Sequence, residues 1–384
     1  MHQDATASDK DLVKLIGKGL SIPDPKILSD KALWKKVIQP SSLDLRLGSK
    51  AWQMEGSIRP MRDETIELMV RGRSIKELHL NEKGTEFLRD RTYIVMLQET
   101  VHDLPAGAQI RSNPKSSTGR LDSLARLLAD CNQQYETLHG HYAGRLYLEV
   151  SPNSFDLVLR RGDALNQIRY SLGNPIMPDK EILSVLRVKP LLYTKEGHPL
   201  TTEQVAVDNG IVLTADLNGE HTDSKIVAYR TKKDCLPLVD FRGVGKHSLY
   251  TYFDAIEKPK GKELKLESGY FYLLSTNEAV SIPPAFAVEL SQFDSRAGNI
   301  TWHYAGFIDP GFGYFPGQEQ QGNTVTLEVR AHNRAEIVRH GQPIGVMKME
   351  RMSSDPLFPY GQARGSNYAR QIGVRYGKHF TDTV

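Results

Sequence analysis

An internal repeat constrains the fold of this chain more than any other feature of its sequence. Residues 144–170 read GRLYLEVSPNSFDLVLRRGDALNQIRY, and residues 323–349 read NTVTLEVRAHNRAEIVRHGQPIGVMKM. When the two stretches are aligned without a gap, the LEV at 148–150 falls on the LEV at 327–329. A glutamate therefore occurs twice in the middle of an apolar strand pattern.

The repeat extends to two further pairs of segments. TYIVMLQETVHDLPAGAQI (92–110) is echoed by FYLLSTNEAVSIPPAFAVEL (271–290). SSLDLRLGSKAW (41–52) finds a weaker echo in PLVDFRGVGKHS (237–248). Repeats of the solenoid type are much shorter than this spacing, so the pattern predicts one whole domain that was copied once.

At 384 residues, the chain is long enough for two domains that each bury a core. We expect a first domain over 1–195, a junction over 196–230 and a second domain over 231–384. The segments of both halves are short, rich in β-branched and aromatic residues, and alternate in polarity between Gly, Pro, Asn and Asp. This pattern is typical of an all-β barrel or sandwich with minor helices.

Helix is predicted in only a few places. One is SDKDLVKLIGKGLS (8–21), where Ser8 or Asp9 could cap an amphipathic turn that ends near Gly19. Another is DSLARLLADCNQQY (122–135), whose apolar residues recur at helical spacing.

Composition and charge exclude several classes of function. A formal net charge of +3 is too small over this length for a surface that coats nucleic acid, so an anion is expected in a local pocket. No apolar run is long enough to cross a bilayer, and the first residues lack the features of a signal peptide. The two cysteines, Cys131 and Cys235, cannot form a disulfide framework, which fits a reducing cytoplasm. They also cannot supply the Cys-x-x-Cys half of a zinc nucleobase-deaminase site.

The segment PKSSTGR (114–120) is a candidate phosphate-binding turn. Lys115, Ser116, Ser117 and Arg120 offer two cations and two hydroxyls within six residues, and charge-assisted donors suit phosphate oxygens. The alternative is a solvated turn between strands, because Ser, Thr, Gly and Lys are common turn residues.

Two carboxylates in the second half are further candidates. Asp309 lies in the turn HYAGFIDPGFG (303–313), where it could accept from a sugar hydroxyl or a base. Alternatively, it only makes an Asx-turn. Glu328 lies between Leu327 and Val329, and it is a candidate proton shuttle if it points inward with few partners, since its pKa then rises. The alternative is an outward, solvated glutamate, because strand alternation places it opposite Leu327.

Four segments, taken together and in this order, resemble the dCTP deaminase family of the trimeric dUTPase superfamily. They are IQPSSLDLRLG, KSSTGRL, AGFIDPGF with the later TLEV, and a late PY…YARQ. The resemblance covers most of the chain, as two tandem copies of a domain that usually occurs once. It implies a distorted antiparallel β barrel of jelly-roll type in each half, which agrees with the strand pattern.

The resemblance also implies roles for single residues. Glu328 is implied to take a proton from the water that attacks C4 of cytosine and to return it to the leaving amine, without zinc. Ser116 and Arg120 are implied to orient that water and the triphosphate. The other implied substrate contacts are Lys115 and Ser117 at the phosphates, Asp309 beside the deoxyribose, the backbone around Ala305 at the base, and Tyr360 and Gln371 in a closing tail.

The two copies differ from the family pattern in a complementary way. The first half keeps the phosphate turn but reads LHGH at 138–141, where the second half reads IDPG at 308–311. The second half keeps Glu328 but reads SQFDSR at 291–296, so the serine pair is lost. Because family sites form between neighbouring barrels, we expect one composite site per chain, with Glu149 structural or vestigial.

The tail departs from the family at one position. Asn367 stands where we align a family lysine, and Arg364, Arg370 or Lys378 could replace that lysine. The alternative for the whole tail is a disordered terminus.

The resemblance implies an enzyme that hydrolyses dCTP to dUTP and ammonia, and the low cysteine content predicts that it is cytoplasmic. Mg²⁺ is expected to accompany the triphosphate, held by phosphate oxygens and water, with no zinc and no metal site built from side chains. The expected partners are dCTP and dUTP, with no nucleic acid polymer and no membrane. The oligomeric state stays open, a homo-oligomer included. One alternative is a dUTP pyrophosphatase or a bifunctional enzyme that forms dUMP, and another is a non-catalytic nucleotide-binding regulator.

Overall fold

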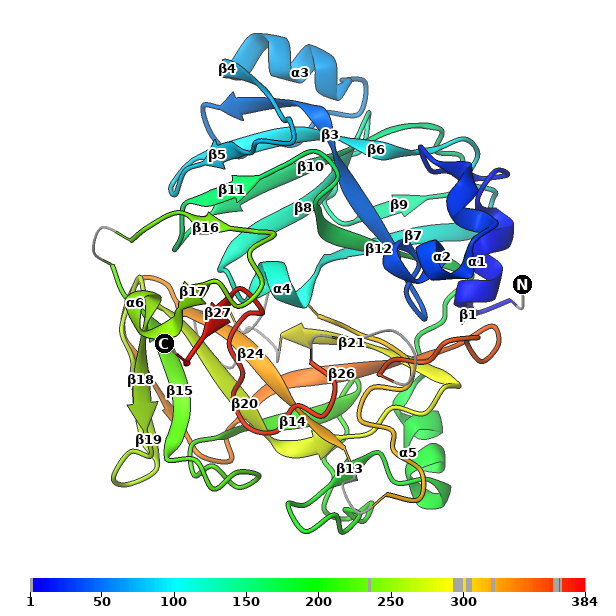
Figure 1. Ribbon diagram of the computed structural model, residues 1–384. Coiled ribbons are helices and arrows are strands. Elements are labelled where there is room, and N and C mark those ends of the chain that lie inside the picture. Colours follow the sequence, from blue (N-terminus) through cyan, green and yellow to red (C-terminus); the bar gives the residue numbers. More distant parts are fainter. Residues whose placement is uncertain are drawn as a thin grey trace.

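The structure consists of two β barrels, one stacked on the other. The computed structural model describes residues 3–233, 236–292, 300–301, 306–318, 322–361, 366 and 368–383. In Figure 1 the first half of the chain forms the upper barrel and the second half forms the lower one. The predicted all-β fold with two tandem barrels and minor helices is confirmed. Within the described residues, none of the helices is both long and apolar enough to cross a membrane.

The first barrel is built on one sheet of antiparallel pairs. The order across it is β8 (Ser123–Ala129), β10 (Gly144–Pro152), β6 (Thr92–Val101), β3 (Leu43–Met54), β12 (Ala164–Leu172), β7 (Ala108–Pro114) and β9 (Thr137–His139). Three short strands pair at its margins: β1 (Ala5–Thr6), β2 (Leu20–Ser21) and β4 (Ser74–His79).

The second barrel repeats this order. Its strands run β22 (Ile300–Thr301), β24 (Asn323–Ala331), β20 (Phe271–Val280), β14 (Ile211–Asp216), β26 (Pro343–Arg351), β21 (Phe286–Gln292) and β23 (Phe307–Ile308). The marginal strands are β13 (Leu192–Tyr193), β15 (Ile226–Thr231) and β18 (Phe253–Glu257). The predicted duplication is therefore confirmed at the level of topology, since β6 and β20, and likewise β10 and β24, hold matching places.

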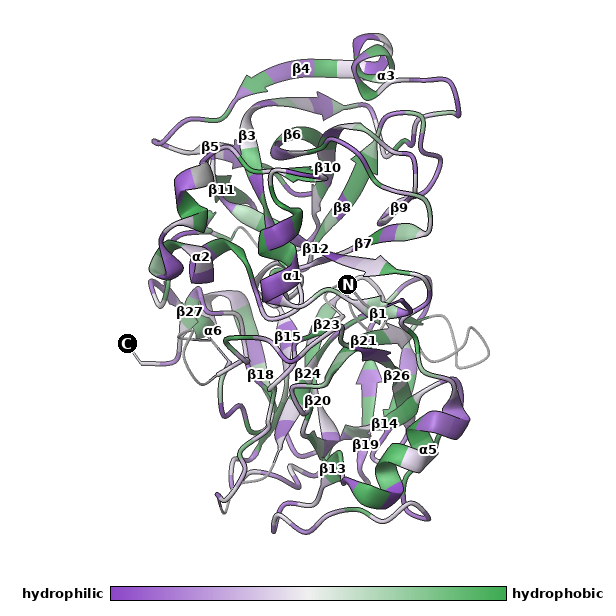
Figure 2. Ribbon diagram, turned by 90° about the vertical axis from the view of Figure 1, so that its right-hand side faces the viewer, coloured by the Kyte–Doolittle hydropathy of each residue, from purple (hydrophilic) through white to green (hydrophobic). Residues whose placement is uncertain are grey.

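Three small sheets and seven short helices complete the described structure. The sheets are β16 (Val239–Asp240) with β11 (Leu157–Leu159) and β5 (Thr85–Phe87), β17 (His247–Ser248) with β27 (Phe380–Thr381), and β19 (Glu263–Leu266) with β25 (Glu336–Arg339). The helices are α1 (Asp9–Leu15), the 3₁₀ turn η1 (Pro25–Leu28), α2 (Lys31–Val37), α3 (Ile66–Arg73), α4 (Ser116–Gly119), α5 (Asp179–Val188) and α6 (Leu249–Tyr252). Figure 2 shows α1 and α2 beside the first barrel and α5 on the outside of the second.

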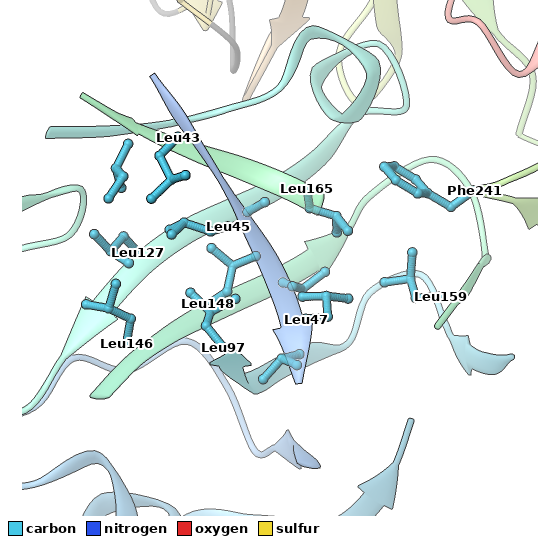
Figure 3. Close-up of a cluster of buried hydrophobic side chains, with 14 of the residues drawn as sticks. Leu43, Leu45, Leu47, Leu97, Leu127, Leu146, Leu148, Leu159, Leu165 and Phe241 are labelled. Carbon is cyan, nitrogen blue, oxygen red and sulfur yellow. The ribbon is translucent and has the colours of Figure 1, made fainter. Parts of the chain in front are cut away.

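Strand alternation fills the core of the first barrel. On β3, Leu43, Leu45 and Leu47 are fully buried and point into the leucine cluster of Figure 3. Burying a leucine side chain contributes about 1.5–3 kcal/mol, so this one strand anchors the barrel. Phe241 from the second half joins the same cluster, so the two halves share part of a core.

Three sequence predictions need correction. The segment 122–135 is not a helix: it contains β8, in which Ala125, Leu127 and Ala129 pack in the barrel core, while Leu128 on the other face packs in the cluster under α3. The weak echo at 237–248 is not the counterpart of β3; that counterpart is β14, since both strands lie between matching neighbours. The expected junction 196–230 accordingly contains β14 and most of β15 instead of a linker.

The predicted N-terminal helix is confirmed as α1, with Ser8 at its N-cap position. It ends at Leu15, earlier than expected, and Gly17 follows with a φ of 88°. The Ser8 side chain makes no capping bond to the helix. The Asp9 carboxylate instead accepts the backbone N–H groups of Leu357 and Phe358, which ties the helix to the C-terminal region.

A fully buried arginine of the first barrel enters the second. Arg169 on β12 donates through Nη1 to the Val288 carbonyl at 2.8 Å and to Glu350 Oε1 at 3.2 Å, and through Nη2 to the Ile308 carbonyl at 2.9 Å. Arg111 reaches the same Glu350 carboxylate at 2.8 Å. Burial raises the pKa of Glu350, but the two guanidinium groups outweigh burial and hold it below its usual range.

We predict that Arg169→Ala lowers the free energy of unfolding by about 3–5 kcal/mol, because it leaves buried polar groups without their partner. Arg230→Ala is the matched control, since the Arg230 side chain pairs with Asp254 and Glu267 but is about a third exposed. The control variant is expected to lower the free energy of unfolding by at most about 1 kcal/mol. Urea unfolding of both variants measures the difference, and equal losses would contradict a special role for Arg169.

The loss of stability in the Arg169→Ala variant should also depend on pH. Because the pKa of Glu350 is lowered in the folded protein, its ionised form stabilises the fold above the unfolded value of about 4.3. That contribution is lost as the pH falls through the folded pKa. The deficit of Arg169→Ala relative to wild type should therefore shrink below about pH 4.

Candidate active site

A pocket of about 270 Å³ lies between the two barrels and is lined by both. Most of the predicted site residues line it, namely Lys115, Ser116, Ser117, Arg120, Asp309, Tyr360 and Gln371. The pocket floor on the second barrel is apolar and includes Leu290, Phe312 and Val325. Residues far apart in the sequence thus form one polar wall around an apolar floor, which suits a nucleotide-sized ligand.

The predicted phosphate turn follows directly from β7. Thr118 and Gly119 donate their backbone N–H groups to the Lys115 carbonyl, which makes α4 a single turn. Ser117 and Arg120 are about 5% and 4% exposed, so the alternative of a solvated turn does not hold. The ammonium group of Lys115 forms an ion pair with Asp44 and stays half-buried in the pocket wall.

Arg120 connects the turn to the C-terminal tail. Its Nη2 donates to Gln371 Oε1 at 2.9 Å, and its Nη1 donates to the carbonyls of Arg375 and Tyr376. The Tyr368 ring lies 3.7 Å from the guanidinium carbon. A charged group of the first barrel is thereby held in place by the last segment of the second.

Gln371 lies at the pocket, but its amide is engaged with the protein. Nε2 donates to the Thr324 carbonyl at 2.8 Å and to Thr326 Oγ1 at 3.0 Å, while Oε1 accepts from Arg120. Gln371 therefore links β24 to the phosphate turn. In this arrangement it positions Arg120 and Thr326, in addition to the substrate contact that the sequence predicts.

Glu328 lies on the face of β24 that meets the first barrel. Leu327 and Val329 point into the second barrel's core, so alternation turns Glu328 the other way, as one of our alternatives held. That face is not solvated, because the first barrel covers it and leaves Glu328 about 2% exposed. A Cβ built on Gly119 would overlap with both carboxylate oxygens of Glu328, so only glycine allows this approach. Glu328 thus lies directly against the phosphate turn, but unlike Thr326 it is not among the residues that line the pocket.

Asp309 accepts a hydrogen bond from Ser41 Oγ at 2.7 Å, across the barrel interface. Arg169 lies 4.0 Å from the same oxygen. The carboxylate is therefore oriented by first-barrel residues and not by an Asx-turn. Ser41 belongs to the motif IQPSSLDLRLG, and its contact with the site carboxylate appears only in the folded structure.

The tail closes against the Asp-Pro-Gly turn. Tyr360 donates its backbone N–H to the Pro310 carbonyl at 2.9 Å, and its ring lies 5.6 Å from that of Phe312. Gly311 has a φ of 96°, and a Cβ there would meet the Tyr360 backbone N at 2.8 Å, so the contact requires glycine. Burial raises the pKa of the Tyr360 hydroxyl, which keeps it protonated as a donor. Ala305 and Asn367 lie outside the described residues.

Glu149, the counterpart of Glu328, has a different environment. It is fully buried, forms an ion pair with Arg126, and accepts from Tyr135 Oη at 2.8 Å and from Ser57 Oγ at 3.0 Å. Burial and the Glu149 charge raise the pKa of Tyr135 to about 12. The segment around α3 covers this face of the first barrel. In the second barrel, the corresponding glutamate, Glu328, instead meets the phosphate turn.

Asp44 is a pocket residue that the sequence reading missed. It alternates with the buried Leu43 and Leu45 on β3, so it points to the pocket side. Its Oδ2 binds Lys115, while its buried Oδ1 has no hydrogen-bond partner among the described residues. Burial raises the pKa of Asp44, and the Lys115 charge offsets part of that rise. The sequence does indicate this position, because Asp44 is a carboxylate between Leu43 and Leu45 in the motif IQPSSLDLRLG.

Comparison with known proteins matches both halves of the chain. A family model described as the 2'-deoxycytidine 5'-triphosphate deaminase N-terminal domain covers residues 15–174, and the corresponding C-terminal domain model covers residues 187–380. A relative from Salinispora arenicola, named "dCTP deaminase, dUMP-forming", is 35% identical over 147 residues, which are 35% of this chain and 71% of the relative. A relative of the same name from Streptomyces avermitilis is 38% identical over 127 residues, which are 32% of this chain and 62% of the relative.

A solved structure extends the match to nearly the whole molecule. The crystal structure of 2'-deoxycytidine 5'-triphosphate deaminase from Agrobacterium tumefaciens is 34% identical to this chain, with a TM-score of 0.79. The match covers 92% of this chain and 99% of the other. Two matching domain models, together with a full-length structural relative, establish that the chain belongs to the 2'-deoxycytidine 5'-triphosphate deaminase family.

Proposed function

We propose that this protein hydrolyses dCTP to dUTP and ammonia at a composite site between its two barrels. The observation that carries the proposal is the contact between Glu328 and Gly119. It brings a buried carboxylate of the second barrel beneath a turn of the first that presents two cations and two hydroxyls. Family membership supplies the substrate class, and the contact supports a base next to a triphosphate site.

In the proposed mechanism, Glu328 removes a proton from water, and the oxygen of that water adds to C4 of cytosine. The proton passes to N3 of the ring. The new hydroxyl then gives up its proton through Glu328 to the amino group, the C4–N bond breaks, and ammonia leaves as the C4 carbonyl forms. Ser116 and Arg120 orient the water and the phosphates. Donors that are held in position in this way lower the activation barrier.

The donor set of the site fits a metal carried by the substrate. Within the described ranges, no group of three His, Cys, Asp or Glu residues comes together as a metal site. The acidic side chains that line the pocket, among the described residues, are Asp44 and Asp309, and hard oxygen donors of this kind suit Mg²⁺ better than zinc. We therefore infer that Mg²⁺ enters with the triphosphate and is held mainly by phosphate oxygens and water.

Divergence of the two copies supports one site per chain. Glu328 lies against the phosphate turn of the first barrel, whereas Glu149 is engaged by Arg126, Tyr135 and Ser57 beneath the α3 segment. Glu149 is then a structural carboxylate. A cytoplasmic location and a homo-oligomer stay predictions, which cell fractionation and light scattering of the purified protein would test.

We predict that Glu328→Gln lowers dCTP turnover by at least about 100-fold, because a general base is removed. Nucleotide binding should persist, since glutamine keeps the shape and remains beside Gly119. Glu149→Gln should retain most of the turnover and lower thermal stability, because Arg126 loses its buried partner. Ammonia release and nucleotide-induced thermal shift, measured on the same preparations, separate the two variants.

Equal loss of turnover in both variants would contradict the composite site and indicate two working sites per chain. Full turnover in Glu328→Gln would remove this glutamate from the mechanism. Nucleotide binding without ammonia release in the wild-type protein would instead support the non-catalytic regulator.

We also predict that turnover requires no transition metal. Treatment with a strong zinc chelator, followed by dialysis into buffer with Mg²⁺, should leave ammonia release unchanged. A loss that only added zinc restores would overturn the proposed role of Glu328 as the group that activates water.

A bifunctional enzyme that also forms dUMP is the second candidate function. It is favoured by the names of the Salinispora and Streptomyces relatives, which describe those proteins as dUMP-forming. Asp44 offers a further carboxylate beside Lys115, with one oxygen unpartnered among the described residues. We expect the protein to release ammonia from dCTP in the presence of Mg²⁺. Measuring pyrophosphate in the same reaction shows whether the nucleotide product is dUTP or dUMP. Ammonia alone means dUTP, equal amounts of both mean dUMP, and pyrophosphate from dUTP without any deamination of dCTP would identify a pyrophosphatase.

A further inference from the structure

A second contact between the barrels lies beside the contact of Glu328 with Gly119. Arg330 on β24 forms an ion pair through Nη2 with Asp122, which comes just after the phosphate turn. Arg330 follows Glu328 by two residues, so strand alternation turns both side chains toward the first barrel. Asp122 is fully buried, and the Arg330 side chain is 17% exposed. The strand β24 thus meets the turn region of the first barrel through two neighbouring side chains of one face.

Asp122 is fixed both to the phosphate turn and to the rest of the first barrel. Its backbone N–H donates to the Gly119 carbonyl at 2.8 Å, and its carbonyl accepts the Asn153 N–H at 3.0 Å. Its carboxylate also accepts from Ser154 Oγ at 2.5 Å, and Arg330 reaches the same hydroxyl at 3.2 Å. The ion pair is therefore linked by one hydrogen bond to Gly119, the residue against which the proposed base packs.

The ion pair favours one relative position of the barrels. Burial raises the pKa of Asp122, and the Arg330 charge offsets part of that rise. On its own barrel, Arg330 is oriented by the bond from Nη1 to the Gly269 carbonyl, which measures 3.2 Å. A buried carboxylate that loses its cation is strongly destabilised, so the barrels are held where Arg330 reaches Asp122.

The first copy of the domain lacks this cation. In the gapless alignment of the repeat, Arg330 falls on Ser151. The Ser151 hydroxyl lies 3.2 Å from Thr92 Oγ1, within its own barrel. The ion pair therefore belongs to the interface at the proposed site and is no general feature of the repeated domain.

We propose that Arg330 is a positioning residue, which through Asp122 holds the Glu328 carboxylate in place against the phosphate turn. This inference rests on the proposed function of the same site. A nucleotide held by the turn presents its C4 to the water that Glu328 activates, and a displacement of about 1 Å can lower such a rate about 100-fold. Neither Asp122 nor Arg330 is among the described residues that line the pocket, so the pair acts on the rate and not on nucleotide binding.

The test compares Arg330→Gln with Arg160→Gln in the full chain. Arg160 is the matched control, because its Nη1 and Nη2 donate to Asp240 at 2.6 and 3.1 Å and its side chain is 15% exposed. That pair also joins the first barrel to the second half of the chain. Both variants should lose stability, but only Arg330→Gln should lower the kcat of ammonia release from dCTP. We expect a decrease of about 10- to 100-fold with little change in KM.

A double-mutant cycle tests whether the two side chains act as one contact. Asp122→Asn should lower kcat about as much as Arg330→Gln, and the double variant should be no slower than the slower single variant. Additive losses would overturn the proposal, as would equal kcat values of Arg330→Gln and Arg160→Gln. If Arg330→Gln does not fold, Arg330→Lys against Arg160→Lys makes the same comparison, with a smaller decrease in kcat expected for Arg330→Lys.

Hydrogen exchange of residues 115–122 tests the positioning without any reference to activity. These amides should exchange faster in Arg330→Gln than in the wild-type protein or in Arg160→Gln, because the turn loses its tie to β24. Unchanged exchange in Arg330→Gln would overturn the proposal. If the wild-type protein releases no ammonia from dCTP, the proposed function fails, while the exchange comparison still decides whether the ion pair holds the turn.

Discussion

The contact on which the rest of the structure depends is the insertion of Arg169 into the second barrel. Its guanidinium joins the Glu350 carboxylate to the carbonyls of Val288 and Ile308, and none of this arginine is exposed. A buried cation of this kind is tolerated only with several partners in good geometry, so the two barrels are held in one relative orientation. Ile308 directly precedes Asp309, so the same contact sets the position of that site carboxylate.

That fixed orientation gives the repeated glutamates different surroundings. In both copies alternation turns the glutamate away from its own barrel core, and another layer must then cover it. For Glu328 the layer is the phosphate turn, and Gly119 leaves room for the carboxylate. For Glu149 the layer is the segment around α3, which supplies Ser57, while Arg126 on the neighbouring strand supplies a countercharge. One sequence pattern thus yields a candidate catalytic group and a structural one.

The tail completes this division between the copies. Gln371 connects Arg120 on the first barrel with β24 on the second, which carries Glu328. A family of single-barrel chains would need two subunits to join such groups, whereas here one chain supplies both. Covalent linkage raises the effective concentration of each half for the other, so loss of one set of groups from each copy is tolerated.

The sequence by itself determined the all-β class, the duplication and a group of pocket residues that includes Lys115, Arg120 and Asp309, because strand alternation and short motifs are local properties. It misjudged β8, because the apolar Leu128 lies on the same face as Arg126, and this interrupts the alternation that identifies a strand. It also assigned the counterpart of β3 wrongly, since only pairing with β20 and β26 identifies β14. Which glutamate meets the turn and which oxygen of Asp44 lacks a partner were decided by tertiary structure alone, because these depend on contacts between residues that are far apart in the sequence or on different barrels.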